Sequence, residues 1–251
     1  MQPDDDKWVI TLKRASERPG IKLICFPYAG GSPEMFRAWA DGLSDRVELL
    51  AVRLPGRGRR LKETLPREWE PLLAEIFEAL SPRLSDPHAF YGHSFGARLA
   101  YEVARLAVAG CPGATRRLFV SGSRSPGSPQ RRPYLHELSD AAFADAVREM
   151  GGTPAEILDN PVMARFFLPI VRADIRLAEI WDDRHGSGVD LPITALYGGS
   201  DPIDGADSMS GWRTYGNAES ELVETAGGHF FPDTHRAPLL DIINSRLQRD
   251  A

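Results

Sequence analysis

The amino-acid sequence predicts an α/β fold with a mostly parallel central sheet flanked by helices. Two observations carry this prediction: short apolar runs alternate with amphipathic stretches along most of the chain, and no repeat or low-complexity segment breaks that order. The length of 251 residues suits one large α/β domain. We therefore expect a single domain over residues 1–251.

The first half of the chain repeats a strand–helix order. Apolar runs of about six residues are typical of buried strands, and longer stretches with an apolar face are typical of helices. The expected elements are a strand at 21–26, a helix at 33–43, a strand at 47–52, a helix at 69–84, a strand at 88–92, a helix at 95–109 and a strand at 118–121.

From about residue 125 to 188 the alternation stops. A loop rich in Pro, Ser and Arg leads into helical patterns at 139–150 and 161–181, with no convincing strand between them. Two or three helices between consecutive strands exceed a simple crossover, so we interpret this segment as a helical insertion over the sheet. The core is then expected at about 1–124 and 189–251, where the pattern resumes with a strand at 192–197, a helix at 207–215, a strand at 221–225 and a helix at 232–247.

The composition excludes several kinds of function. The chain is 42% hydrophobic and 26% charged with a formal net charge of −5, so it has no general basic surface for nucleic acid. Arginines do gather between Arg53 and Arg60, but Gly and Pro among them indicate a loop. We interpret it as a solvated basic loop, with a role in binding a ligand or partner as the alternative.

The ends and the cysteines bear on compartment and cofactors. The acidic opening Met1–Asp6 lacks the features of a signal peptide, and no apolar run approaches a membrane span, so we expect a cytoplasmic protein. Cys25 lies in an apolar run and Cys111 follows a probable helix end, which does not indicate a disulfide framework. No Cys/His cluster has metal-ligand spacing, and we expect neither metal nor cofactor.

The segment Gly92–Gly96 carries the strongest motif. It reads Gly-His-Ser-Phe-Gly and lies between a predicted strand and a predicted helix, as the G-x-S-x-G nucleophile elbow of the α/β-hydrolase fold requires. Glycine two residues either side of Ser94 lets the backbones close up around a strained turn. Ser94 is therefore the predicted nucleophile, and the alternative is a simple helix N-cap.

A serine hydroxyl needs a base, and in this fold an acid and then a histidine follow the serine along the chain. His229 fits because it lies in a Gly-rich loop between the last predicted strand and the last helix. Asp201 follows the strand at 192–197 and is the predicted acid, which would orient the imidazole; Asp204 and Asp207 are alternatives. The competing histidines are less suitably placed: His88, His93, His136, His185 and His235.

Acyl transfer also needs donors for the oxyanion that forms on attack. The amide of Phe95, directly after the nucleophile, is one candidate. The other should come from the loop after the first strand, Phe26–Ser32, where the Gly30–Gly31 pair lets the main chain approach a substrate. Ala29 or a neighbour would supply that N–H group, unless the loop is only a turn.

Five motifs lie along the chain in this order: Phe26–Ser32, Leu54–Gly58, Gly92–Gly96, Gly199–Asp201 and Gly228–Phe231. Together they resemble the type II thioesterases of polyketide and nonribosomal peptide synthesis. The resemblance implies an α/β-hydrolase fold, a triad of Ser94, Asp201 and His229, an oxyanion hole made by the Ala29 and Phe95 amides, and a mobile helical lid at about 125–188. It also implies a substrate: an acyl group held as a thioester on the phosphopantetheine arm of an acyl or peptidyl carrier protein.

Two points depart from the family pattern or stay open. The family often has Met or Leu after the serine, whereas this chain has Phe95, which keeps the backbone donor but could narrow the acyl pocket. Phe166, Phe167 and Trp181 in the insertion are candidates to line the substrate channel, with plain core packing as the alternative.

The predicted function is hydrolysis of carrier-bound acyl thioesters through an acyl-serine by a monomeric enzyme, without nucleic acid or membrane partners. One alternative is an oxygen-ester hydrolase or acyltransferase that uses the same triad. A second, from another class, is a non-catalytic binding module on the same scaffold. Acidic carrier proteins could meet the Arg57–Arg60 loop or Arg131 and Arg132.

Overall fold

A seven-stranded sheet forms the centre of the computed structural model, which describes residues 6–16 and 20–250. The strand order is β1-β3-β2-β4-β5-β6-β7, with β1 antiparallel to β3 and all other neighbours parallel. The predicted α/β-hydrolase fold is therefore confirmed. The strands are β1 (Val9–Lys13), β2 (Ile21–Phe26), β3 (Val47–Val52), β4 (His88–His93), β5 (Thr115–Ser121), β6 (Ile193–Gly198) and β7 (Glu221–Thr225).

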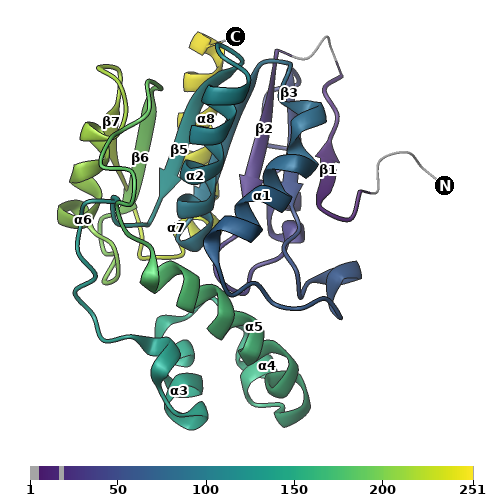
Figure 1. Cartoon of the computed structure of the whole chain (residues 1–251), viewed down its shortest axis with the longest axis vertical. Helices are drawn as coiled ribbons and strands as arrows, with labels where there is room; N and C mark the ends of the chain where they lie inside the picture. Colours follow the sequence, from purple (N-terminus) through teal and green to yellow (C-terminus); the bar gives the residue numbers. More distant parts are fainter. Residues whose placement is uncertain (1–5, 17–19, 251) are drawn as a thin grey trace.

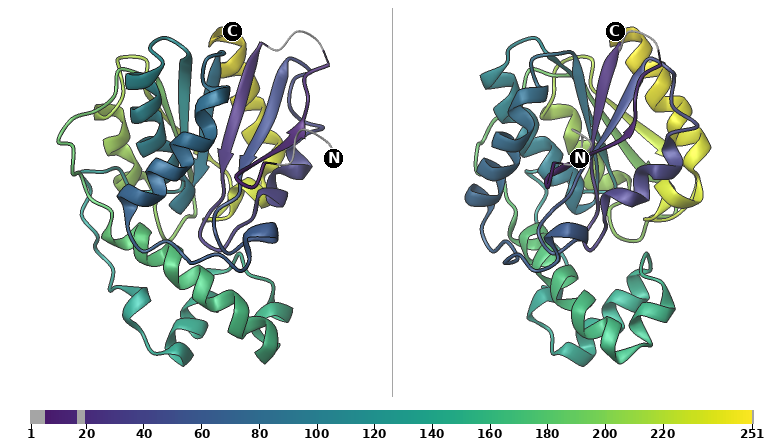
Figure 2. Two further views of the ribbon diagram at one scale, coloured as in Figure 1. Left: turned by 45° about the vertical axis from the view of Figure 1, so that its right-hand side comes forward. Right: turned by 90° about the vertical axis from the view of Figure 1, so that its right-hand side faces the viewer.

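Helices cover both faces of this sheet. Helices α1 and α2 lie on one face and α8 lies on the other, as the edge-on view in Figure 2 shows. The α-helices are α1 (Trp69–Leu80), α2 (Phe95–Gly110), α3 (Asp140–Met150), α4 (Ala155–Leu158), α5 (Pro161–Ile180), α6 (Ala206–Ser210), α7 (Phe231–Thr234) and α8 (Arg236–Asp250). The 3₁₀ segments are η1 (Pro33–Trp39), η2 (Gly58–Arg60), η3 (Ser81–Arg83), η4 (Leu135–Glu137) and η5 (Gly211–Thr214).

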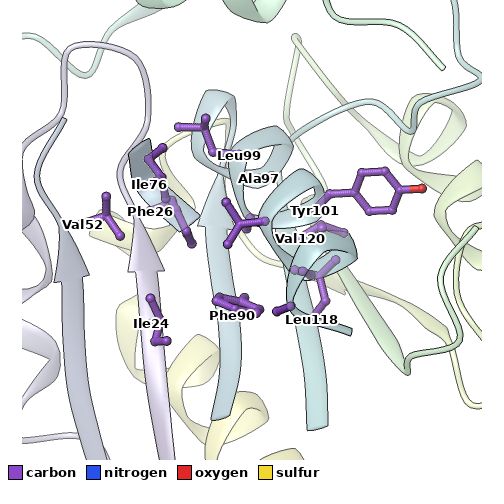
Figure 3. Close-up of a cluster of buried hydrophobic side chains, with 14 of the residues drawn as sticks. Ile24, Phe26, Val52, Ile76, Phe90, Ala97, Leu99, Tyr101, Leu118 and Val120 are labelled. Atoms are coloured by element: carbon purple, nitrogen blue, oxygen red, sulfur yellow. The ribbon is translucent and has the colours of Figure 1, made fainter. Parts of the chain in front are cut away.

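Alternate residues of each strand enter different cores, because successive side chains of a strand point to opposite faces. Ile24 and Phe26 of β2 pack under α1 and α2, whereas Leu23 and Cys25 pack under η1 and α8. Figure 3 shows the first cluster, in which side chains of β2–β5 meet those of α2. Burial on both faces holds the central strands in place, and the loops at their ends start from these positions.

The segment between β5 and β6 contains α3, α4 and α5, which lie beyond one end of the sheet in Figure 1. Asn160 caps the start of α5 by accepting hydrogen bonds from the amides of Val162 and Met163. At its other end three side chains from the core bind α5 and the residue after it: Trp69 donates to the Leu177 carbonyl, Arg98 to that of Ala178 and Arg124 to that of Trp181. The insertion is thus attached most firmly through the C-terminal end of α5.

Several boundaries differ from the sequence-based expectations. The short edge strand β1 was not predicted, because five residues with only one fully buried position give little periodic signal. The helix expected at 33–43 is the 3₁₀ segment η1, and Pro82 ends α1 at Leu80. The four-residue helix α4 also went unpredicted.

The interpretation of the Arg53–Arg60 segment as a solvated basic loop was wrong for all of its arginines except the exposed Arg59. Arg53, Arg57 and Arg60 are between 1% and 6% exposed. Arg60 lies over the Trp8 ring at 3.4 Å and donates to the Arg53 carbonyl and the Glu63 carboxylate. Of these partners only Trp8 is distant in the chain, and together they allow a long side chain with a polar head to be buried.

Two sequence-based expectations concern membranes and export. Among the residues that the structure describes, no helix combines the length and the apolar character needed to cross a bilayer. The opening segment Met1–Asp6 lies outside the described residues except for Asp6, whose carboxylate accepts a hydrogen bond from the Trp8 amide.

Candidate active site

Ser94 occupies the sharp turn between β4 and α2. Its backbone has φ 54° and ψ −116°, and it is the one non-glycine residue with positive φ in the described ranges 6–16 and 20–250. Such a conformation is costly for an L-residue and persists only where the surroundings enforce it. The Ser94 side chain makes no helix-capping hydrogen bond, so the N-cap alternative does not account for this serine.

The two glycines of the motif are required by close backbone contacts. A Cβ atom on Gly92 would lie 2.0 Å from the Gly96 carbonyl oxygen, and one on Gly96 would lie 2.2 Å from the Phe26 carbonyl oxygen. Both contacts are far below van der Waals separation. The second shows that the end of β2 lies directly against the start of α2.

Asp201 and His229 come together across the ends of β6 and β7. His229 Nδ1 lies 2.8 Å from Asp201 Oδ2, and these side chains are 5% and 0% exposed. Asp201 Oδ1 accepts hydrogen bonds from the amides of Ile203, at 2.7 Å, and Asp204, at 3.1 Å. Both carboxylate oxygens therefore have partners, and the imidazole has a defined orientation.

The contacts of Asp201 also set its charge. Burial raises the pKa of its carboxyl, but the hydrogen bond and positive charge of His229 together with the two amides outweigh burial, so the pKa lies below its usual value. The carboxylate is therefore ionised at neutral pH, as a partner of His229 must be.

The ring of His229 lies beside the serine turn. Its centroid is 5.0 Å from that of His93, the residue before Ser94. A Cβ atom built on Gly122, at the end of β5, would lie 2.6 Å from His93 Cε1 and 3.3 Å from His229 Cε1. Among the hydrogen bonds of the described residues none joins the Ser94 hydroxyl to His229, and in unliganded enzymes this bond is often long.

The alternative acids and histidines have other partners. Asp204 Oδ2 lies 3.9 Å from Arg98 Nη2 rather than near the imidazole. His136 and His185 pair with Glu179 and Glu102. The remaining alternatives also lie outside the Asp201–His229 pair: Asp207 in α6, His88 at the start of β4 and His235 between α7 and α8.

The predicted oxyanion donors lie on adjacent segments. Phe95 is the first residue of α2, and Ala29 lies in the loop after β2, whose end touches Gly96. Within the described part of the chain the Ala29 amide donates no hydrogen bond, whereas that of Gly31 donates to the Tyr28 carbonyl. The Tyr28 ring, in turn, packs edge-on against His93 and Phe230.

The three candidate aromatic residues of the insertion lie in different environments. Phe166 is 67% exposed, and Phe167 is half-buried with its Cζ 3.1 Å from a Cβ position on Gly30. Trp181 is 1% exposed, donates to Glu102 and stacks on Trp212. Its position in the core favours plain core packing, the alternative to a role in the substrate channel.

The insertion contacts loops on both sides of the site. Helix α5 packs on Gly30, and the turn before α4 lies on the residue after His229, since a Cβ on Gly152 would be 2.2 Å from Phe230 Cζ. Sequence reasoning did not connect Asp174 of α5 with the site, yet its carboxylate accepts a hydrogen bond from the Gly30 amide. No periodic or motif signal distinguishes Asp174 from other polar residues of α5.

A cavity of about 810 Å³ is lined largely by residues of α5. Its walls include Leu65, Arg67, Leu168, Arg172 and Arg176, and they include none of Ser94, Asp201 and His229. This cavity therefore does not include the serine turn.

Comparison with known proteins identifies the family of the chain. A family model described as thioesterase domain matches residues 21–247. The linear gramicidin dehydrogenase LgrE of Brevibacillus parabrevis is 32% identical over 245 residues, which cover 96% of this chain and 93% of that protein.

Solved structures give the same result. The thioesterase RedJ from the prodiginine biosynthetic pathway of Streptomyces coelicolor superposes with a TM-score of 0.84 at 37% identity, covering 93% of this chain and 94% of that one. The type II thioesterase BorB from the borrelidin biosynthetic cluster gives 0.85 at 34% identity, covering 96% and 98%. With matches of this length and identity, the chain belongs to the thioesterase family as a type II thioesterase, and it is a thioester hydrolase.

Proposed function

We propose that the enzyme removes acyl groups from the phosphopantetheine arm of acyl or peptidyl carrier proteins, with Ser94 as nucleophile, His229 as base and Asp201 as its orienting acid. One observation carries this proposal: the strained Ser94 lies beside an imidazole whose far nitrogen is 2.8 Å from a buried carboxylate. This arrangement can activate a hydroxyl that is otherwise a weak nucleophile.

The reaction proceeds in two halves. His229 takes the Ser94 proton as the hydroxyl oxygen attacks the thioester carbonyl, and the Ala29 and Phe95 amides donate to the resulting oxyanion. The C–S bond then breaks, the pantetheine sulfur receives the proton from His229, and an acyl-serine remains. Water then repeats the sequence. His229 takes a proton from the water as its oxygen attacks the acyl-serine carbonyl, which gives a second oxyanion. When this oxyanion collapses, the bond to the Ser94 oxygen breaks, Ser94 receives the proton from His229, and the free acid departs.

The family and the relatives, which include enzymes of antibiotic pathways, support this substrate. The role that fits a separate thioesterase is editing, the removal of acyl groups that have stalled on their carriers. We further propose that α3–α5 act as a lid, that Phe166 and Phe167 contact the acyl chain, and that the enzyme works as a monomer in the cytoplasm, where its carriers would be found.

A panel of carrier proteins that differ only in the acyl group tests this proposal. Wild-type enzyme should release free acid from several of them, and Ser94→Ala should lower kcat about 10⁶-fold, because the three residues act as a unit. A fluorophosphonate should label wild-type protein at Ser94 and leave Ser94→Ala unlabelled. Near-normal turnover by the alanine variant would exclude the mechanism.

The nearest competing activity is hydrolysis of oxygen esters. Comparing an acyl-pantetheine thioester with the matching oxygen ester separates the two, because the acyl group is the same and only the leaving atom differs. Faster hydrolysis of the oxygen ester would argue against carrier-bound thioesters as the main substrate.

A further inference from the structure

Helix α5 of the insertion lies directly on the loop that carries Ala29. Gly30 has φ +77°, and a Cβ atom there would lie 2.7 Å from Val171 Cγ2 and 3.1 Å from Phe167 Cζ. No side chain separates the helix from the main chain of the loop. Any displacement of α5 therefore changes the surroundings of Gly30 at once.

A buried ion pair reinforces this contact. Asp174, one turn beyond Val171 on α5, accepts a hydrogen bond from the Gly30 amide at 2.8 Å and pairs with the Arg57 guanidinium. The Asp174 and Arg57 side chains are 2% and 4% exposed. Arg57 also donates to the carbonyls of Gly31, at 3.2 Å, and Pro55, at 2.8 Å.

The pair therefore holds the loop through two successive glycines. Asp174 fixes the N–H of Gly30 and Arg57 fixes the C=O of Gly31. A peptide unit is planar, so fixing the Gly30 N–H also fixes the peptide bond between Ala29 and Gly30. The position of the Ala29 N–H group then depends only on the φ and ψ angles of Ala29. If α5 moved away, the Gly30 amide would lose its acceptor and the Arg57 guanidinium would lose its carboxylate partner.

We propose that Asp174 is a positioning residue that couples the lid to the oxyanion hole, so that the Ala29 N–H group is held in its active position only while α5 is docked. This inference rests on the proposed role of Ala29. Such coupling gives the lid a chemical effect besides covering the site: stabilisation of the tetrahedral oxyanion depends on lid closure. Substrates that keep the lid displaced would bind but turn over slowly.

Substitutions at position 174 test the coupling through kcat and KM on an acyl-pantetheine thioester. We expect Asp174→Ala to lower kcat about 10²-fold, comparable to the loss of one oxyanion donor, with KM changed less than about twofold. Asp174→Asn keeps an oxygen that can accept from Gly30 but loses the charge that pairs with Arg57, so its kcat should lie between those of the wild type and the alanine variant. The control is Asp140→Asn in the same lid, whose fully exposed carboxylate pairs with Arg172 and which should behave as wild type.

Hydrogen exchange supplies a readout that does not depend on turnover. In Asp174→Ala the amides of residues 28–32 and of α5 should exchange faster together, whereas Asp140→Asn should leave residues 28–32 unchanged. If the alanine variant fails to fold, the nearly isosteric Asp174→Asn carries the same test with smaller effects.

Each result bears on the coupling. Three results with Asp174→Ala would overturn the coupling: a wild-type kcat, a change confined to KM, or a loss of activity that matches the loss of sites titrated by the fluorophosphonate. If the wild-type protein itself fails to hydrolyse the thioester, the proposed function fails, and the coupling is judged by exchange alone. Faster exchange in only one of the two segments would then contradict it.

Discussion

Asp201 and Asp204 are three residues apart, yet their carboxylates meet opposite surroundings. Asp201 contacts His229 at 2.8 Å, whereas Asp204 lies 3.9 Å from the Arg98 guanidinium. Both follow β6 in the same loop, so sequence position could rank them but could not separate them. The hydrogen bonds from the Ile203 and Asp204 amides to Asp201 show why the nearer residue turns inward.

This difference predicts the kinetics of two matched variants. Asp201→Asn should lower kcat about 10⁴-fold, because an amide there favours the wrong imidazole tautomer while leaving the shape of the site intact. Asp204→Asn removes a charge near Arg98 and should leave kcat close to that of the wild type. Steady-state kinetics on one thioester substrate measure both, and the reverse ranking would move the acid to Asp204.

Phe166 is the lid residue whose role a single substitution can test. It is 67% exposed, so Phe166→Ala should not change the melting temperature. If its ring contacts the acyl chain, the variant should raise KM for long acyl groups about fivefold, the equivalent of about 1 kcal/mol of lost apolar contact. Leu106→Ala, an exposed apolar position near the far end of α2, is the control; equal KM in both variants would exclude the contact.

At the scale of elements, the turn between β4 and α2 is the most constrained part of the fold. Its glycines were predicted from the spacing of the motif, and the structure gives the atoms they avoid, the carbonyl oxygens of Gly96 and Phe26. Local steric rules of this kind can be inferred from sequence because the partners lie within one or two elements. The same holds for the apolar runs that became β2, β3 and β7, whose predicted limits match the observed ones.

Alanine substitutions at the two ends of α2 should therefore differ strongly. Gly96→Ala would place a methyl group 2.2 Å from a backbone oxygen that cannot move without disturbing β2, so we expect little folded protein and no activity. In Gly110→Ala the added methyl group meets only the Phe77 ring edge, at 3.2 Å, so this variant should keep both the folded state and the activity. Soluble yield and thermal melting measure the contrast; a stable, active Gly96→Ala protein would contradict the assigned packing.

The insertion shows what local patterns cannot give. The helical periodicity predicted α3 and α5 well, but not which residues of α5 would meet the loops of the sheet. Asp174 and Arg57 are 117 residues apart in the chain, and neither has a local feature that indicates a buried ion pair. Their contact depends on where the insertion folds back, which only the packed structure decides.

For the whole molecule, two buried histidines predict how stability depends on pH. Burial lowers the pKa of His88, and burial followed by the charge of His229 lowers that of His93 well below its usual range. Near pH 6.5 the unfolded chain takes up protons at these positions while the folded protein does not, so the free energy of unfolding falls as pH decreases below about 7.

We expect the midpoint of urea unfolding to decrease from pH 7 to pH 5, and His88→Gln to reduce that decrease. His88 Nδ1 donates to the Asp86 carbonyl and Nε2 accepts from the Thr115 hydroxyl, so the variant will also be less stable at pH 7. The informative quantity is therefore the slope with pH rather than the stability itself. A slope that is the same in wild type and variant would exclude His88 as a source of the pH dependence of stability.

The sequence by itself determined the fold class, the family, the serine turn and the loop that carries His229, because each depends on short-range sterics or on the order of elements along the chain. Only the tertiary structure decided which aspartate meets the imidazole, which arginines are buried, that Trp181 belongs to the core, and that α5 rests on Gly30. Those outcomes depend on groups that are remote in sequence and meet only when helices pack on the sheet, where burial selects the pairs that satisfy each other's charge and hydrogen bonds.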